Sequence, residues 1–398
     1  MDAARGYWER IPARGWVLAS VVAVLAFLYP SYAGSLAGLP AVGVYVPAVD
    51  SMVVMIVFTM MAVGLNVVVG YAGLLDLGYV AFYAAGAYTA AWLASQHFEQ
   101  WTFHLGSAGL SPELPGIHLS LWLVLLVAGL FTAVTGILIG LPTLRLRGDY
   151  LAIVTLGFGE IIPQVVRNGD DIRGINFTGG SFGISPIDAP GFGETLSGAG
   201  LPVNYAQSFD RARLFYWTAV ALLLFTVFCC VRLRDSRLGR AWIAIREDET
   251  AAAAMGVPLM RTKTWSYAIG AFFGGIAGAY YASFKSGAFP ADFYFNISIF
   301  LLCMVILGGM GSVWGVILGG MILGWLNVEG LATIGSEIGL QDVPRYQFGI
   351  YGIIIVAMML FRPTGLIPER RHKREMEEGV ADTPLYDVSH GGGGQEGH

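Results

Sequence analysis

Charge is scarce in this chain of 398 residues, of which 13% are Asp, Glu, Lys or Arg and 55% are hydrophobic. This scarcity excludes an ordinary soluble globular domain, in which about a quarter of the residues are charged. Repeated windows of roughly 20 residues carry no charge, which is enough for a helix to cross a hydrocarbon core about 30 Å thick. The polar and apolar alternation of a membrane β-barrel is missing. The sequence therefore predicts an all-α, polytopic integral membrane protein.

Lysine is rarer still, since it occurs only at Lys263, Lys285 and Lys373 and never follows a glycine. A phosphate-binding loop needs Gly-Lys-Ser/Thr, because backbone amides and the lysine together hold the phosphates. An ATP site of this type is therefore excluded. No Ser/His/Asp set or carboxylate pair stands in a context that predicts hydrolysis. We expect a non-catalytic chain that binds no cofactor itself.

Cysteine is also scarce, and each occurrence falls in an apolar run: Cys229, Cys230 and Cys303. That placement is typical of small apolar fillers and not of disulfides. Three histidines share the segment 96–118 with two glutamates, but their spacing fits no regular metal site. We expect no bound metal.

Apolar runs predict about ten spans, near residues 16–33, 49–69, 77–95, 119–142, 150–166, 214–231, 264–284, 296–310, 312–328 and 346–361. The first run lacks a small-residue cleavage site, so we expect a retained helix and not a signal peptide. The chain then divides into an N-terminal segment 1–15, a transmembrane domain 16–361 and a charged, glycine-ending tail 362–398 that we expect to be disordered.

Positive charge predicts the orientation. With both termini in the cytoplasm, 17 of the 23 Lys and Arg residues fall on the cytoplasmic side, as the positive-inside rule requires. This orientation places the long segment 168–213, rich in Gly, Pro, Ser and Asp, outside the cell. The segment 232–263 faces the cytoplasm.

The segment 232–263 is dense in charge between two long apolar runs, which favours a docking surface. Its pattern predicts two short amphipathic helices. The first places Leu238, Trp242 and Ile245 on one stripe. Asp248 or Glu249 begins the second, which ends near Gly256 before Pro258.

Two acidic residues, Asp76 and Glu160, lie inside or at the edge of predicted spans. Acids in membranes are costly and are functional candidates by default, although the turn at 70–76 could instead bring Asp76 to the cytoplasmic surface and Glu160 could join two helices. Glycines also interrupt the apolar runs 67–78 and 305–315 in a similar way. The alternatives are an internal repeat that breaks helices beside a substrate path, or glycines that only permit close helix packing.

Several stretches together resemble the LivM-type permeases of bacterial branched-chain amino acid ABC importers. They are GLNVVVGYAGLLDLGYVAFYAAGAY at 64–88, RGDYLAIVTLGFGE at 147–160, TGGSFGI at 178–184, the charged segment 232–263, GGMGS at 308–312 and RPTG at 362–365. These stretches follow one another over residues 50–365. The segment 232–263 is similar to the loop that contacts the ATPase in such importers, with Thr250-Ala-Ala and Gly256 in the places of Glu-Ala-Ala and Gly.

The resemblance implies a permease of the bacterial inner membrane that pairs with a second, homologous permease. It also implies two cytoplasmic ATPases, which bind ATP and Mg, and an extracytoplasmic protein that delivers Leu, Ile or Val. The residues implied to contact the ATPase are Arg240, Arg246, Glu249, Thr250, Ala251, Ala252 and Gly256. Candidate pathway residues are Asn66, Gly70, Gly73, Asp76, Tyr79, Thr155, Glu160, Gly308, Gly309 and Gly311. Candidate external docking residues are Thr178, Gly179 and Gly180.

The alternative function is a proton- or ion-coupled secondary transporter of small organic solutes. In that case Asp76 and Glu160 would be the coupling acids, because an acid that changes its protonation inside the membrane can link proton flow to transport. The two functions assign opposite importance to these side chains.

Overall fold

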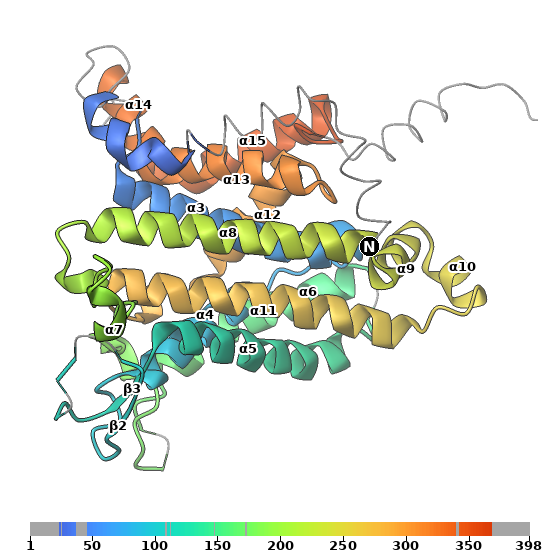
Figure 1. The fold of residues 1–398 in the computed structure, drawn as a ribbon. Helices are drawn as coiled ribbons and strands as arrows, with labels where there is room; N and C mark the ends of the chain where they lie inside the picture. Colours follow the sequence, from blue (N-terminus) through green and yellow to red (C-terminus); the bar gives the residue numbers. More distant parts are fainter. Residues whose placement is uncertain are drawn as a thin grey trace, which may run out of the picture.

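Long helices that lie roughly parallel dominate the computed structural model, which describes residues 24, 26–36, 46–107, 110–111, 113–146, 148–171, 173–339 and 342–367 (Figure 1). Seven segments in this part of the chain are long and apolar enough to cross a membrane: Val49–Tyr71, Leu121–Thr143, Asp149–Arg167, Arg211–Asp235, Pro290–Gly308, Val313–Glu337 and Val343–Phe361. The prediction of an all-α polytopic membrane protein is confirmed.

Helix α3 (Val49–Asn66) lies at the centre of the bundle. Nearly every residue from Val53 onward is buried, as expected for a helix that is apolar on all sides. The helices that pack around it are α8 (Arg211–Asp235), α11 (Leu259–Lys285), α12 (Phe295–Gly308) and α13 (Val313–Trp325). A short π-helix, η2 (Val67–Tyr71), continues α3 and ends in a non-helical stretch.

Small residues let α11 pack closely against α4 (Val80–Leu93) and α5 (Leu121–Thr143). A Cβ atom added to Gly86 of α4 would lie 2.1 Å from the carbonyl oxygen of Gly275 on α11, so no larger residue fits there. Such small-residue contacts are how membrane helices gain packing energy, because hydrocarbon gives them no hydrophobic drive to associate.

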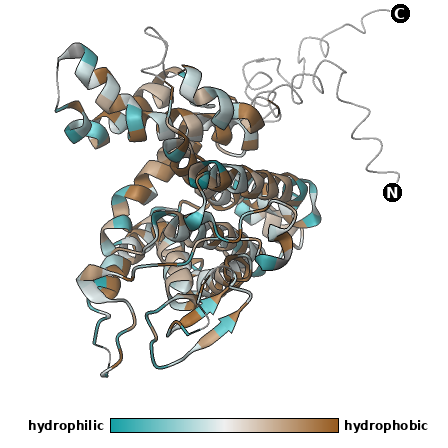
Figure 2. Cartoon of the chain, turned by 60° about the vertical axis from the view of Figure 1, so that its left-hand side comes forward, coloured by the Kyte–Doolittle hydropathy of each residue, from teal (hydrophilic) through white to brown (hydrophobic). Residues whose placement is uncertain are grey.

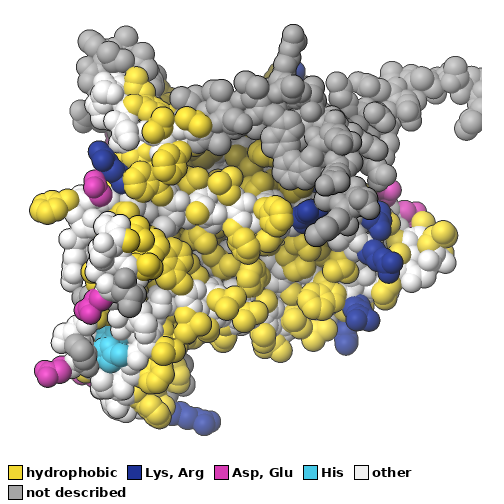
Figure 3. All heavy atoms as spheres, viewed as in Figure 1, with side chains coloured by type: hydrophobic (Ala, Val, Ile, Leu, Met, Phe, Trp, Pro, Cys, Tyr) yellow, Lys and Arg dark blue, Asp and Glu magenta, His cyan; other side chains and the backbone are white. Residues whose placement is uncertain are grey.

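The outer surface is apolar where it would meet lipid. Hydrophobic side chains cover the middle of the face in Figure 3, and Lys and Arg gather beside α9 (Arg237–Glu247) and α10 (Glu249–Ala254). Figure 2 shows hydrophobic residues along the length of the bundle. Helix α15 (Gln347–Phe361) is mostly exposed, with Ile353, Leu360 and Phe361 open to the surroundings.

The end of the bundle opposite α9 and α10 carries a small sheet that the sequence did not predict (Figure 1). Its strands are β1 (Ala94–Ser95), β2 (Phe103–Leu105) and β3 (Ile117–Leu119), in the order β1-β3-β2, with β1 antiparallel and β2 parallel to β3. His118 Nδ1 lies 2.7 Å from Asp188 Oδ2, which ties the sheet to the segment 168–213. Burial raises the pKa of Asp188, and the hydrogen bond with His118 opposes this rise.

Short helices complete the connections. They are η3 (Gly180–Phe182), α7 (Glu194–Ser197) and η4 (Tyr205–Gln207) in the segment 168–213, then η5 (Pro290–Asp292), η6 (Leu326–Gly330), α14 (Leu331–Ile338) and η7 (Val343–Tyr346). Helix α6 (Asp149–Arg167) runs through Pro163 without interruption.

The predicted spans match observed helices with two differences. The span predicted at 77–95 is a helix only from Val80 to Leu93, and these 14 residues are too few to cross alone. The stretch before it is non-helical and mostly buried, with Gly73 and Leu75 exposed. Non-helical backbone is tolerated at membrane depth where protein or a water-filled cavity surrounds it. The span predicted at 264–284 is shorter than the observed helix α11, which begins at Leu259, ends at Lys285 and is rich in glycine and tyrosine.

Residues at both ends of the chain limit the other comparisons. Half of the span predicted at 16–33 lies outside the described residues. Residues 26–36 are helical, and the carbonyl oxygens of Ala26 and Phe27 accept hydrogen bonds from Tyr216 and Trp217 of α8. The segment 1–15 and residues 368–398 of the predicted tail also lie outside them. The count of about ten spans and the internal repeat therefore stay predictions.

Candidate functional site

The charged segment folds as two helices, as its pattern predicted. The Ser236 hydroxyl accepts a hydrogen bond from Gly239 N at 3.2 Å at the start of α9. The Asp248 carboxylate accepts from Thr250 N at 2.7 Å and from Ala251 N at 3.0 Å, and so caps α10. Beyond α10 the chain turns at Gly256, whose φ of +85° favours glycine.

The apolar stripe of α9 faces the bundle. Trp242 is fully buried, and its indole N–H donates to Thr262 O of α11 at 2.7 Å. Ile245 is also buried, whereas Leu238 is half-buried at the edge. This stripe holds α9 against α8 and α11.

Arg246 connects α9 to the π-helix η2. Its guanidinium donates to Gly70 O, across 176 residues of sequence. A Cβ atom on Gly73 would lie 2.9 Å from the Arg246 Cγ, and Gly73 has a φ of +68°. The end of α9 therefore rests directly on the break that follows α3.

The two glycine-rich interruptions meet at this break. The Asn66 side chain accepts a hydrogen bond from Gly311 N at 2.9 Å, and both groups are buried. A Cβ atom on Gly70 would lie 1.9 Å from Asn66 Oδ1 and 2.6 Å from Gly311 N. Glycine at 70 thus permits a close approach of the two segments, and the internal repeat beside a substrate path stays a prediction.

Polar groups hold the non-helical stretch after η2 in place. Asp76 is buried and accepts from Gly78 N at 2.8 Å, while Leu77 N donates to the Thr155 hydroxyl at 3.0 Å. The Tyr79 hydroxyl donates to Gly270 O at 2.8 Å. The predicted pathway residues Asp76, Tyr79 and Thr155 are therefore packed between helices.

The break between α12 and α13 is covered from the other side. Gly309 has a φ of +112°, and a Cβ atom there would lie 2.9 Å from the carbonyl oxygens of Thr364 and Ile367. Ile367 N donates to Gly308 O at 3.1 Å. Gly308 and Gly309 are therefore closed off by the chain that follows α15, and Gly311 contacts Asn66.

An ion pair joins α10 to α11. Lys263 Nζ lies 2.8 Å from Glu249 Oε1, with side chains 4% and 27% exposed. Beside the pair lies a cavity of about 190 Å³, whose charged lining residues are Asp149, Arg246, Glu249 and Lys263. Ala252 is buried beneath α10, while Thr250, Ala251 and Met255 face outward, Met255 being 85% exposed. Arg240 is exposed and bonds only locally, to Asp235 O at 2.9 Å.

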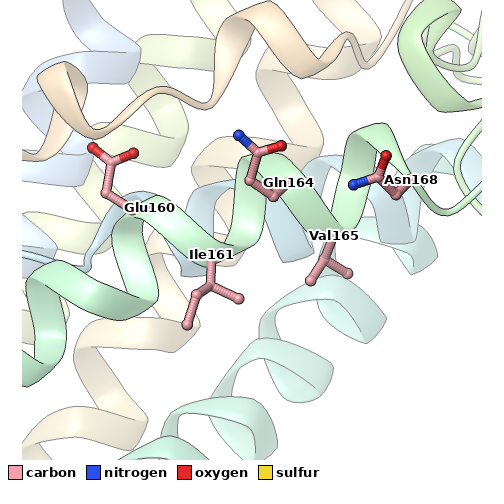
Figure 4. A pocket seen from close by; sticks show the side chains of 5 residues that line it. All are labelled: Glu160, Ile161, Gln164, Val165 and Asn168. Carbon is pink, nitrogen blue, oxygen red and sulfur yellow. The ribbon is translucent and has the colours of Figure 1, made fainter.

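Glu160 lies apart from this cluster, on the exposed face of α6. It lines a hollow of about 650 Å³ together with Ile161, Gln164, Val165 and Asn168 (Figure 4). Within the described residues its carboxylate has no hydrogen bond or ion pair, so it joins no two helices of this part of the chain. The predicted acids Asp76 and Glu160 are thus in opposite environments, one buried and one open.

The candidate docking residues at 178–180 form a tight turn. Thr178 is buried and donates to Val166 O at 2.6 Å, and it accepts from Gly180 N at 3.3 Å. Thr178 therefore fixes the turn to the end of α6 without reaching the surface. The neighbouring Phe182, which was not predicted, is 91% exposed.

Sequence reasoning missed further residues of these sites. Gln164 and Asn168 follow Glu160 at intervals of four, a helical period that could have been found in the sequence. No such periodicity marks Lys263 or Ser298. Lys263 pairs with Glu249, and the Ser298 hydroxyl accepts a hydrogen bond from Val80 N, and both contacts depend on how distant elements pack.

Comparison with known proteins identifies close relatives. Residues 48–359 match the family model described as branched-chain amino acid transport system, permease component. The chain is 38% identical over 345 residues to the high-affinity branched-chain amino acid transport system permease protein LivM of Escherichia coli K12, covering 84% of this chain and 73% of that protein.

Two further relatives are more distant. The probable LivM permease of Methanocaldococcus jannaschii is 28% identical over 255 residues, covering 62% of this chain and 68% of that protein. The LivH permease of Escherichia coli K12 is 28% identical over 166 residues, covering 41% of this chain and 50% of that protein. No solved structure matches the chain.

Proposed function

The chain belongs to the branched-chain amino acid transport system permease family, and from this membership we propose that it is one of two permeases in an ATP-driven importer for Leu, Ile and Val. The second permease is a homologue, as LivH is related to this chain at lower identity. Two cytoplasmic ATPases bind ATP and Mg, and an extracytoplasmic binding protein delivers the substrate. The chain lies in the inner membrane with both termini in the cytoplasm.

The contact between α9 and the break carries this proposal. Arg246 and the backbone of Gly73 place one end of α9 on the π-helix η2, next to the Asn66 and Gly311 contact. A displacement of α9 therefore also moves the segment in which α3 meets the connection between α12 and α13. The exposed outer face of α10, with Met255 at its tip, is available to an ATPase.

The mechanism follows from this geometry. ATP binding closes the two ATPases and moves α9 and α10 together, since these helices contact each other, and the pair between Glu249 and Lys263 links α10 to α11. The break absorbs the movement, because non-helical backbone can change its dihedral angles without rupturing a full helix. The permease pair then changes from inward-facing to outward-facing, and the binding protein releases its amino acid into the opened pathway.

Substitution on α10 tests the docking surface. Met255→Glu adds a charge to an 85% exposed apolar side chain without disturbing the fold of α10, in contrast to a change at the buried Ala252. We expect it to release the ATPases during co-purification and to abolish ATP-driven leucine uptake. Phe209→Glu, at an exposed position two residues before α8 begins, is the matched control. ATPases retained by Met255→Glu at the level of the control would contradict the assignment.

Reconstitution distinguishes the ATP-driven importer from the secondary transporter. Asp76 is the acid that this alternative needs, since its Oδ2 atom has no hydrogen-bond partner in the described structure. Proteoliposomes with the complete assembly, binding protein outside and ATP inside, should accumulate leucine with Asp76→Asn as with Asp76, because ATP drives the cycle. Accumulation driven by a pH gradient without ATP, and lost in Asp76→Asn, would establish the alternative.

A further inference from the structure

One face of α6 carries a row of polar side chains. Glu160, Gln164 and Asn168 follow one another at intervals of four residues, so they lie above one another over about 12 Å of helix. All three are exposed, and their side chains have no hydrogen bond or ion pair within the described residues. Figure 4 shows them directed to one side of α6, while Ile161 and Val165 point away.

This row is incompatible with contact to lipid. Helix α6 is long and apolar enough to span the membrane. A charged side chain at the centre of a span costs about 2.5–3.5 kcal/mol on insertion scales, and more in simulations. The exposed face of α15 is apolar instead, as contact with lipid requires, and presents Ile353, Leu360 and Phe361. The α6 face therefore borders water or another protein.

The hollow at this face, of about 650 Å³, is open, because all five of its lining residues lie on α6 or at its end. A small solute would be enclosed here only when a second protein covers the hollow. Its lining combines one carboxylate and two amides with the apolar side chains of Ile161 and Val165. Such a surface offers a charge, hydrogen bonds and apolar contact together, the three features of a branched-chain amino acid.

No basic side chain of the described residues pairs with Glu160. The nearest basic residue along α6 is Arg167, seven positions away, and it donates to the Tyr294 hydroxyl at 3.0 Å. An ammonium group matches a carboxylate in charge and donates the hydrogen bonds that it accepts. The carboxyl group of an amino acid can in turn accept from the amide groups of Gln164 and Asn168.

Resting on the proposed function, we propose that this α6 face is a wall of the translocation pathway, where Glu160 binds the ammonium group of the passing amino acid. The second permease forms the opposite wall. The buried acid Asp76 has no part in binding, because it is enclosed between helices.

Cysteine labelling tests the wall in the complete assembly. In a background without Cys229, Cys230 and Cys303, Gln164→Cys should react with a charged, water-soluble thiol reagent, and leucine should protect it. Ile353→Cys is the control, since Ile353 is 71% exposed on the apolar face of α15 and a cysteine there should not react. Equal labelling at both positions, or labelling at Gln164→Cys that leucine does not reduce, would overturn the proposal.

A second measurement tests the role of Glu160 without the binding protein, whose own affinity would otherwise dominate uptake. In the Gln164→Cys background, Glu160→Gln should raise the half-protecting leucine concentration about tenfold, because a charge-assisted hydrogen bond is lost. The hydroxy analogue 2-hydroxyisocaproate lacks the ammonium group, so it should protect poorly when Glu160 is present. Glu160→Gln should bring the half-protecting concentrations of leucine and the analogue closer together.

Gly157→Ala is the control for a general disturbance of α6, since its added methyl group meets no atom within 4 Å, and it should leave the half-protecting concentration unchanged. An unchanged value in Glu160→Gln would overturn the proposal even if ATP-driven uptake by the unmodified assembly is normal. Absence of ATP-driven uptake by the unmodified assembly would instead contradict the proposed function. The two failures are therefore distinguishable.

Discussion

Removing the charge of Glu249 should destabilise α10 more than removing that of Lys263. The two side chains form an ion pair at 2.8 Å, but Lys263 is 4% exposed and Glu249 is 27% exposed. Glu249→Gln leaves an ammonium group buried without its carboxylate partner. Lys263→Met leaves a carboxylate that can still reach water. The two single substitutions should therefore have unequal effects although they break the same pair.

The magnitude follows from this difference in burial. Breaking a buried ion pair from one side costs roughly 3–5 kcal/mol, so we expect about 3 kcal/mol for Glu249→Gln. For Lys263→Met we expect about 1.5 kcal/mol, because solvent screens the remaining carboxylate. The double substitution should lie close to the unmodified chain, since it removes both charges together.

Hydrogen–deuterium exchange of the assembled transporter measures this effect locally. The amides of Ala252, Met255 and Val257 each donate to a backbone carbonyl in or beside α10, so they report its opening. Exchange should accelerate about a hundredfold in Glu249→Gln and about tenfold in Lys263→Met. Equal rates in both variants, or a double variant as fast as Glu249→Gln, would refute the reasoning.

Two other predictions concern packing and orientation. Gly70→Ala should lower thermal stability and ATP-driven uptake, because its Cβ atom would overlap Asn66 Oδ1, whereas Gly157→Ala on α6 meets no atom within 4 Å and should be neutral or stabilising; equal melting temperatures would contradict the tight contact. Cysteines at the exposed positions Ser181 and Ser197, in a background without the native cysteines, should react with an impermeant reagent added to intact cells. Labelling only after the membrane is opened would invert the orientation.

The sequence predicted some of the candidate functional residues. Only the structure showed which of them lie together and which lie apart. The charged segment, its two helices and a start of the second at Asp248 or Glu249 were predicted, because capping and amphipathic periodicity involve neighbours within a few residues, and the structure places the cap at Asp248. Asp76 and Glu160 were grouped as candidates because both are acids in apolar runs. The structure buries the first and leaves the second open, a difference that the surrounding helices determine.

The sequence alone determined the class of the protein and the approximate spans, since hydrocarbon thickness and backbone hydrogen bonding leave long apolar helices as the solution. It did not reveal that α4 is short and preceded by a non-helical stretch. Tertiary structure alone brought Gly311 to Asn66, Arg246 to Gly70 and Ile367 to Gly308. These contacts join residues far apart in the chain, so they depend on how whole helices pack and not on the local pattern that each helix carries.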